Sequence, residues 1–316
     1  ISAEVNSIQN WIPAKAAEFF KTLENPSEPV GEIGEHCQSP YECPFIAYCW
    51  KHVPEYSIFT LPGARWTAKA EYISKGLLAL DDVSEDALNE RQLKYLKSYR
   101  TQAPIIDKSA IKNELNKLEY PLYFLDFETD GPAIHRFFGM RPFEQFPFQF
   151  SCHKLEEKGK LEHFWFLHTD MDDPRKDIAE SLINTLGTHG SIIAYNAPFE
   201  IRFIKNLAGW FPDLATDLLA MVDRFWDQLP IFRNYYIDYR FLGSASIKYV
   251  LPVLVPSLSY EALNVSGGTE AQATWNTMIQ TKDADLKAKL IDNLLEYCGQ
   301  DTYAMVEIHR VLKKLI

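Results

Sequence analysis

The sequence has few cysteines, no long uncharged apolar run and no surplus of basic residues, and each lack excludes a class of protein. Five cysteines among 316 residues are too few for a secreted disulfide scaffold, and no signal-peptide pattern opens the chain. The longest uncharged apolar stretch, residues 249–260, is interrupted by Pro252 and Pro256, and a bilayer requires about 20 consecutive apolar residues. These absences favour a cytoplasmic protein.

The net charge is acidic, −11, from 32 Lys and Arg against 43 Asp and Glu. Such a chain lacks the general basic surface that attracts nucleic acid, which argues against a protein that covers a duplex. An enzyme that holds a few nucleotides beside metal ions stays compatible, because the ions supply local positive charge. The apolar content of 47% and the aromatic content of 14% are sufficient for a core and exclude global disorder.

The length and the residue pattern together predict two regions. At roughly 150 residues per domain, 316 residues correspond to two domains or one large one. Residues 1–105 are expected to form a mostly helical accessory region, with an amphipathic helix over residues 84–102 that buries Leu88, Leu93 and Leu96. Residues 106–316 are expected to form a separate α/β domain.

The pattern after residue 105 indicates a mixed β-sheet flanked by helices. Strands are predicted at residues 121–128, 147–155, 161–168 and 191–196, with the first strand central and the next two joined as a hairpin. Helices are predicted at about residues 175–186, 198–208 and 283–315. A hairpin followed by alternating helices and strands is typical of such a sheet.

Two acids end the predicted central strand. Asp126 and Glu128 are two residues apart, so their side chains point to the same face. Like charges held side by side repel and are costly to desolvate. Either this face is wet or a cation lies between the two carboxylates, and a polar strand end is the commoner meaning of such a pair taken alone.

The last predicted helix carries a third acid within its apolar stripe. The stripe has the helical spacing Leu294, Cys298, Asp301, Met305, Ile308 and Leu312. Asp301 therefore occupies a core position, where a carboxylate is costly unless it is paired with Arg or Lys or bound to a metal. Tyr297 lies four residues earlier on roughly the same face.

A fourth acid follows the strand predicted at residues 191–196. In the sequence AYNAPFE, Asn196 ends the strand, Pro198 suits the first turn of a helix, and Glu200 falls within that turn. Asn is a good helix cap, and Glu is favoured near a helix N-terminus. Taken alone, this motif is more typical of capping than of catalysis.

The order Asp-x-Glu, Asn-x3-Glu, Tyr-x3-Asp over residues 120–316 resembles the DEDD exonucleases of the DnaQ-like branch of the RNase H-like fold, in the subtype with a tyrosine. The resemblance implies a 3′–5′ exonuclease that hydrolyses phosphodiester bonds at DNA or RNA ends, preferably single-stranded, with two Mg²⁺ or Mn²⁺ ions. It implies that Asp126 bridges the ions, that Glu128 and Asp301 bind one of them, and that Glu200 is more distant. Tyr297 would orient the attacking water. Glu200 departs from the family, which usually has Asp, so the position of the second ion is left open.

Three further residues are candidates for substrate binding: Asn196, Arg141 in the loop after the first strand, and Lys248. Lys248 could contact a phosphate, although its segment is equally explained by Ser244 or Ser246 as a helix cap. The sequence MVDRFWDQL contains two further acids, Asp223 and Asp227, either of which could supply a spare carboxylate. A position on the solvated face of a helix is the more typical explanation for them.

The N-terminal region contains three cysteines with five residues between each pair: Cys37, Cys43 and Cys49. In a reduced chain, clustered cysteines indicate metal ligands before disulfides, and thiolates suit zinc or an iron–sulfur cluster. His36 or His52 could complete a zinc site, and a cysteine upstream of the first residue could complete a [4Fe–4S] cluster. Unligated thiols are the alternative. The other two cysteines, Cys152 and Cys298, are expected in the core.

The cysteine segment resembles the tail of RecB-like nucleases that carry an iron–sulfur staple, in which one cysteine precedes the module and three follow it. The whole layout resembles a bacterial family that joins a RecB-like nuclease module to a DnaQ-like module. The resemblance implies an upstream RecB-like module as a partner, which agrees with a chain that begins at Ile1 rather than Met.

Two other functions fit the same residues. A hydrolase of small nucleotides or dinucleotides suits the acidic net charge equally well. Alternatively, Glu200 could mark a catalytically degenerate domain that binds nucleic acid or protein without turnover.

Overall fold

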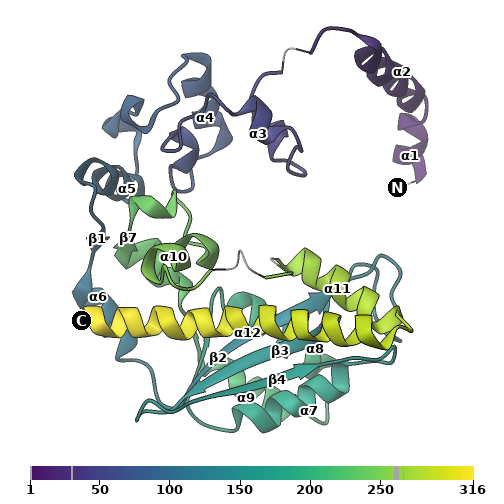
Figure 1. Cartoon of the computed structure of the whole chain (residues 1–316), viewed down its shortest axis with the longest axis vertical. Helices are drawn as coiled ribbons and strands as arrows, with labels where there is room; N and C mark the ends of the chain where they lie inside the picture. The colour runs from purple at the N-terminus through teal and green to yellow at the C-terminus, as the bar shows by residue number, and fades with distance from the viewer. Residues whose placement is uncertain (1, 30, 260–262, 266) are drawn as a thin grey trace. The chain divides into compact units, whose positions relative to one another are not determined.

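The structure is a computed structural model of the whole chain that describes residues 2–29, 31–259, 263–265 and 267–316 (Figure 1). It contains two compact units, one of Ile1–Phe59 with Gly63–Val83, the other of Thr60–Pro62 with Ser84–Ile316. The predicted boundary after residue 105 therefore lies inside the second unit. The segment before that boundary is tied to the second unit by α5 (Glu90–Thr101), where the Tyr95 hydroxyl donates to the main-chain oxygen of Tyr239 at 3.3 Å and the Ser98 hydroxyl accepts from its N–H at 3.0 Å. Next to it, β1 (Ile105–Ile106) pairs with β7 (Tyr236–Ile237).

The first unit is mostly helical, as predicted. Its helices are α1 (Ser2–Ile8), α2 (Trp11–Glu24), α3 (Ile46–Cys49) and α4 (Trp66–Ser74). No residue of α1 or α2 is buried. An aromatic cluster follows α3, in which the rings of Trp50 and Phe59 lie 4.3 Å apart and Lys69 lies over the ring of Trp66.

The second unit is built on a five-stranded mixed sheet, which confirms the predicted fold class. The strand order is β4-β3-β2-β5-β6, so the acid-bearing strand β2 is central. Strand β2 is antiparallel to β3 and parallel to β5, and β5 is parallel to β6. The strands are β2 (Leu122–Asp130), β3 (Phe146–Leu155), β4 (Leu161–Leu167), β5 (Ser191–Ala194) and β6 (Phe225–Asp227).

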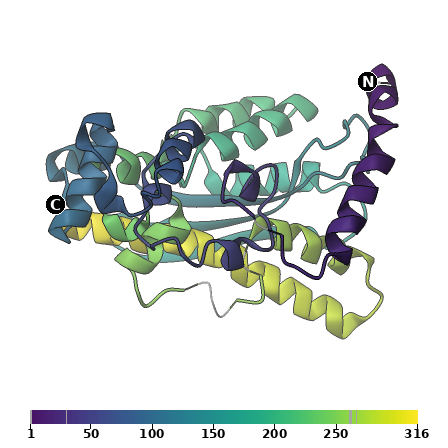
Figure 2. The same cartoon turned by 90° about the horizontal axis from the view of Figure 1, so that it is seen from above.

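Helices cover both faces of this sheet. The predicted helices are confirmed as α7 (Arg175–Leu186), α8 (Pro198–Trp210) and α12 (Ala284–Leu315). The unit also contains α6 (Lys108–Leu115), α9 (Ala215–Val222), α10 (Ile247–Leu254), which follows the predicted cap Ser246, and α11 (Gly268–Gln280). Figure 2 shows the sheet between the helices of residues 175–222 and the yellow helix α12. Among the residues that the structure describes, no helix is long and apolar enough to span a membrane.

The alternation of β2 decides which layer each side chain meets. Tyr123, Leu125 and Phe127 pack into the core beneath α7, α8 and α9. Leu122 and Phe124 pack on the other face, with Met305 of α12. Because side chains alternate along a strand, Asp126 and Glu128 share the face that α12 covers.

The helix predicted over residues 84–102 is shorter than expected. Helix α5 spans Glu90–Thr101 and begins at a capping box, in which the Asn89 side chain accepts from the main-chain N–H of Gln92. The residues before it form a short 3₁₀ helix, Glu85–Ala87. The prediction is correct for Leu96, which is buried, and wrong for Leu93, which is 37% exposed. Tyr95 is buried instead, and its hydroxyl donates to the main-chain oxygen of Tyr239 at 3.3 Å.

Candidate metal centre

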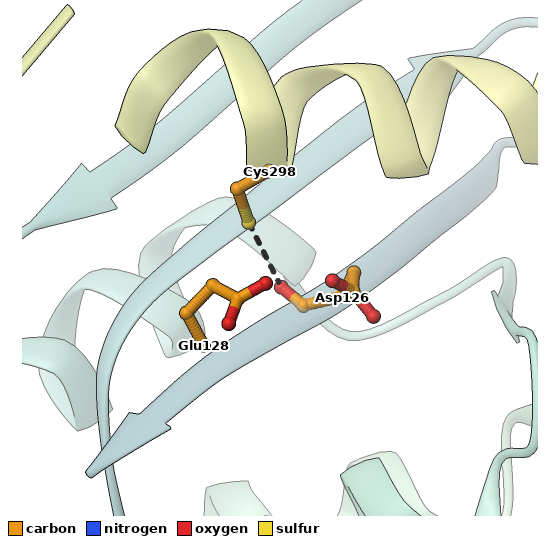
Figure 3. Close-up of side chains that lie close together, drawn as sticks. All are labelled: Asp126, Glu128 and Cys298. Carbon is orange, nitrogen blue, oxygen red and sulfur yellow. Dashed lines mark hydrogen bonds between the residues drawn. The ribbon is translucent and has the colours of Figure 1, made fainter. Parts of the chain in front are cut away.

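Two acids and a thiol meet where β2 passes under α12 (Figure 3). The ligand atoms of Asp126, Glu128 and Cys298 all lie within 4.8 Å of one another. Glu128 is 6% exposed, Cys298 is fully buried and Asp126 is partly buried. The Cys298 thiol donates to the main-chain oxygen of Asp126 at 3.9 Å. Among the described residues, this is the one group of three potential metal-binding side chains whose ligand atoms all lie within 4.8 Å of one another.

Helix α12 adds Asp301 and Tyr297 to this group. The predicted stripe is confirmed, since its apolar members are buried and Asp301 is partly buried among them. The Asp301 carboxylate raises the pKa of both Asp126 and Glu128 through repulsion. Burial, followed by repulsion from the acids, holds the pKa of Tyr297 far above its usual value, so its hydroxyl stays protonated.

Burial is the main cause of the raised pKa values in the centre. It raises the pKa of Asp126, and Asp301 adds to the effect. It also raises the pKa of Glu128, together with Asp126 and Asp301, and the ammonium group of Lys248 only partly opposes the rise. Carboxylates in this position are costly as anions unless a cation joins them.

A hydrogen-bonded network holds α12 in its register on the hairpin. The hydroxyl of Thr302, next to Asp301, lies 2.7 Å from the Ser151 hydroxyl and 2.8 Å from Nδ1 of His153. The Ser151 hydroxyl also lies 2.8 Å from Nε2 of His163, whose ring stacks on that of His153. Burial and the neighbouring His163 lower the pKa of His153 to about 4. The network fixes which turn of α12 faces Asp126.

Glu200 approaches the centre from the first turn of α8. It is 2% exposed, and its Oε2 atom has no hydrogen-bond partner among the described residues. Burial raises its pKa, followed by repulsion from Asp126 and, more weakly, from Asp227. Capping does not account for this motif, because the N-cap residue is Ala197 and no side chain caps the helix. Asn196 lies outside the helix, exposed, with φ of 79°.

Asp227 is a fifth acid near the centre, and its expected place on a helix face is wrong. It ends β6 beside Ala194 of β5. Its Oδ1 atom accepts hydrogen bonds from the main-chain N–H groups of Asn196 at 2.9 Å and Leu229 at 3.0 Å. The sequence did not predict β6, because three residues are too few to show the alternation typical of a strand. Asp223, in contrast, is exposed at the end of α9.

A cavity of about 360 Å³ opens over the acids. The acids Asp126, Glu128 and Asp301 line it together with Tyr297. The cavity is also lined by Tyr195, Phe199, Ser246, Ile247, Lys248, Gly268, Thr269 and Gln272. Lys248, a candidate phosphate contact, therefore lines the cavity, and its role as a substrate contact stays a prediction. Asn196, Arg141 and Glu200 are not among the lining residues, and Arg141 is exposed.

The donor set suits a hard divalent cation. Oxygen ligands of one Mg²⁺, each at about 2.1 Å, lie at most about 4.2 Å apart. The carboxylate oxygens of Asp126 and Glu128 lie within 4.8 Å of each other, so a small side-chain rotation is enough to bring both onto one ion. Glu200 offers a buried oxygen for which the described residues provide no hydrogen-bond donor, and such an oxygen is a further potential ligand. The residues present thus fit the metal that the motifs predict.

The cysteines of the first unit are not gathered in the same way. Cys37 is buried, while Cys43 and Cys49 are partly buried, and none is in a disulfide. The main-chain N–H of Cys43 donates to the oxygen of Cys37 at 2.8 Å. In the described part of the chain, these residues do not form a group of three ligand atoms within 4.8 Å, so a metal there stays a prediction. Cys152 and Cys298 are in the core, as predicted.

Comparison with known proteins adds one match. Residues 123–246 match the model of a family described as a domain of unknown function, DUF2779. The matched region begins in β2 and includes Asp126, Glu128, Glu200 and Asp227, and it ends before Tyr297 and Asp301. No curated protein and no solved structure matches the chain.

Proposed function

We propose that the second unit is a metal-dependent 3′–5′ exonuclease that hydrolyses phosphodiester bonds at DNA or RNA ends. The observation that carries this proposal is the convergence of Asp126, Glu128 and Asp301 on one cavity. Acids that are buried together and raise one another's pKa favour a bound cation. A metal-activated water beside a nucleotide-sized cavity is an arrangement that supports phosphodiester hydrolysis.

Each side chain takes a role that follows from its position. Bound Mg²⁺ or Mn²⁺ would neutralise the carboxylates and stabilise the attacking and leaving oxygens. Asp126, between the other acids, would contact both ions, while Glu128 and Asp301 would hold one of them and Glu200 the other. The Tyr297 hydroxyl remains protonated because burial, and after it the neighbouring acids, raise its pKa, so it can donate a hydrogen bond that orients the attacking water.

The lining of the cavity supports a nucleotide substrate. A volume of about 360 Å³ lies within the range of small-ligand sites. The aromatic side chains of Tyr195 and Phe199 line it, and unpaired bases stack on such side chains. A single-stranded end fits these features better than a duplex. The 3′–5′ direction follows from the resemblance to the DEDD exonucleases.

A single-turnover assay on end-labelled DNA and RNA oligonucleotides tests the proposal. We expect mononucleotide release with Mg²⁺ or Mn²⁺ and none in EDTA, with a loss of roughly a thousandfold or more in Asp126→Asn and Asp301→Asn. Glu157→Gln makes the same charge change at the exposed turn between β3 and β4 and is the matched control. Cleavage of dinucleotides only would indicate a small-nucleotide hydrolase, binding without turnover would indicate a degenerate domain, and release in EDTA would contradict the metal mechanism.

We also propose that Cys37, Cys43 and Cys49 hold zinc or an iron–sulfur cluster in the first unit. The support is their clustering within 13 residues, Cys37 to Cys49, with His36 and His52 beside them. Anaerobic purification followed by metal analysis should find zinc or iron in the wild type and a clear loss in Cys43→Ser, while Cys152→Ser, a core cysteine, keeps the metal.

A further inference from the structure

A second set of residues lines the cavity over the acids, and it contributes positive charge where the acids contribute negative charge. Ser246, Ile247 and Lys248 begin α10, and Gly268 and Thr269 begin α11. Two helix N-termini therefore open on the space that the carboxylates also face. The first N–H groups of a helix have no intrahelical acceptor, and they carry a partial positive charge.

Among the described residues, the N-cap residue of neither helix accepts a hydrogen bond from the helix through its side chain. The N-cap residue of α11 is Gly267, which has none to offer. Ser246 is the N-cap residue of α10, as one of the two predicted alternatives has it, but its side chain accepts no hydrogen bond from the helix. The Ser244 hydroxyl accepts a hydrogen bond from the main-chain N–H of Ser246 at 3.1 Å. Within the described residues, the N–H groups of the first turn of each helix receive no hydrogen bond from the side chain of its N-cap residue, the acceptor that usually satisfies them.

Glu128 provides an independent sign of a ligand in the same space. It is 94% buried, as its exposed fraction is 6%, and within the described residues its carboxylate forms no hydrogen bond. A Cβ on Gly268 would lie 3.8 Å from Oε2 of Glu128, so the start of α11 is adjacent to the acid and yet does not donate to it. A metal-bound phosphate would satisfy both groups at once, with the ion on the carboxylate and its oxygens on the N–H groups.

Helix α11 is held firmly in this position. The Asp130 carboxylate, at the end of β2, accepts a hydrogen bond from Nε2 of Gln272 at 2.6 Å. The indole of Trp275 donates to the main-chain oxygen of His168 at 2.8 Å and stacks on Phe148. These contacts tie α11 to the strand that carries Asp126 and Glu128. A rigid placement reduces the entropic cost of binding an anion.

We propose that the N-termini of α10 and α11, together with Lys248, form a phosphate-binding wall that holds the phosphate of a nucleotide against the metal centre. The proposal rests on the proposed function and deepens it, because it names nucleotides with a phosphate group as the ligand class. Lys248 supplies the full charge, and a position near Glu128 is consistent with its effect on that acid. The main-chain N–H groups supply direction.

Thymidine 5′-monophosphate and thymidine, titrated in Ca²⁺ by calorimetry or NMR, are the probes. We expect the monophosphate to bind at least tenfold more tightly than thymidine. Lys248→Ala should weaken monophosphate binding roughly tenfold or more without changing thymidine binding, and Lys248→Arg should restore most of it. Lys289→Ala removes an exposed lysine of α12 and should change neither affinity.

Thr269→Glu tests the helix N-terminus separately from the lysine. An acid there is favourable to the helix, so the fold is kept, but its charge competes with the phosphate and should abolish the preference for the monophosphate. Thr277→Glu places the same change at an exposed position of α11 outside the cavity and should leave the preference intact. Melting curves verify that each variant is folded.

The outcomes separate this inference from the proposed function. Three results would overturn the phosphate-binding wall even if the nuclease is active. They are equal affinity for the two probes, no detectable binding of the monophosphate, and monophosphate binding that neither Lys248→Ala nor Thr269→Glu weakens. Wall-dependent monophosphate binding without any metal-dependent cleavage would support the wall and contradict the exonuclease.

Discussion

Replacing Asp126 by asparagine should make the metal-free protein more stable while it removes the response to metal. In the absence of a cation, the carboxylates of Asp126, Glu128 and Asp301 repel one another and are poorly hydrated, as their raised pKa values indicate. The amide of Asn has nearly the same shape and no charge. It therefore relieves the repulsion without leaving a cavity.

The magnitude follows from the separation of the acids. Two charges 4.8 Å apart, the limit for the ligand atoms of Asp126 and Glu128, repel by about 3 kcal/mol at an effective dielectric constant near 20. Acids with raised pKa values retain protons, and Asp126 is partly exposed, so we expect a gain of roughly 1–2 kcal/mol in the free energy of unfolding. The sign follows from linkage, because an acid whose pKa is raised on folding destabilises the protein as pH rises above the unfolded value.

Bound metal should make the wild type more stable than Asp126→Asn, the reverse of the order expected without metal. A ligand at a hundred times its dissociation constant stabilises the folded protein by about 2.7 kcal/mol, and this gain belongs to the wild type, because Asp126 is the acid placed to contact both ions. Urea unfolding near neutral pH, in EDTA and in saturating Mg²⁺, measures both effects, and Glu157→Gln is the control. The reasoning is refuted if Asp126→Asn is less stable than the wild type in EDTA, or if Mg²⁺ stabilises the two proteins equally.

Three further results are expected. Tyr297→Phe keeps the buried ring but removes the hydroxyl, so it should lower the single-turnover cleavage rate by roughly ten- to a hundredfold while the unfolding free energy changes by less than about 1 kcal/mol; an unchanged rate would exclude the water-orienting role. Asp227→Ala removes the acceptor of the Asn196 and Leu229 N–H groups and should cost about 1–3 kcal/mol in urea unfolding, and Asp227→Asn, which keeps an acceptor oxygen, should cost less. Burial, followed by the charges of Lys313 and Arg310, lowers the pKa of His309 from 6.5 to about 4. The stabilisation associated with neutral His309 is therefore complete above pH 6.5, and about 3 kcal/mol of the free energy of unfolding is lost as pH falls towards 4. His309→Phe should flatten that part of the stability–pH curve, and a curve of unchanged slope would show that His309 is not the group responsible.

The sequence by itself determined the elements whose periodicity is long and uninterrupted. The alternation of β2, the β3–β4 hairpin, and the helices α7, α8 and α12 follow from spacing that local packing preserves. The apolar stripe of α12 identified Asp301 as an acid in a core position. These features depend on neighbouring residues, so a single sequence carries them.

The tertiary structure alone decided which of these residues meet. Strand β6 has three residues and places Asp227 at the sheet edge through its pairing with β5. The face of α5 that is buried is the one that carries Tyr95 and Ser98, which contact Tyr239 far along the chain, and Leu93 lies outside it. The N-termini of α10 and α11 reach the cavity only through contacts between segments far apart in the chain. Periodicity shows which side of an element is buried, whereas the partner that buries it depends on long-range packing, and it is this packing that brings Asp126, Glu128 and Asp301 to one cavity.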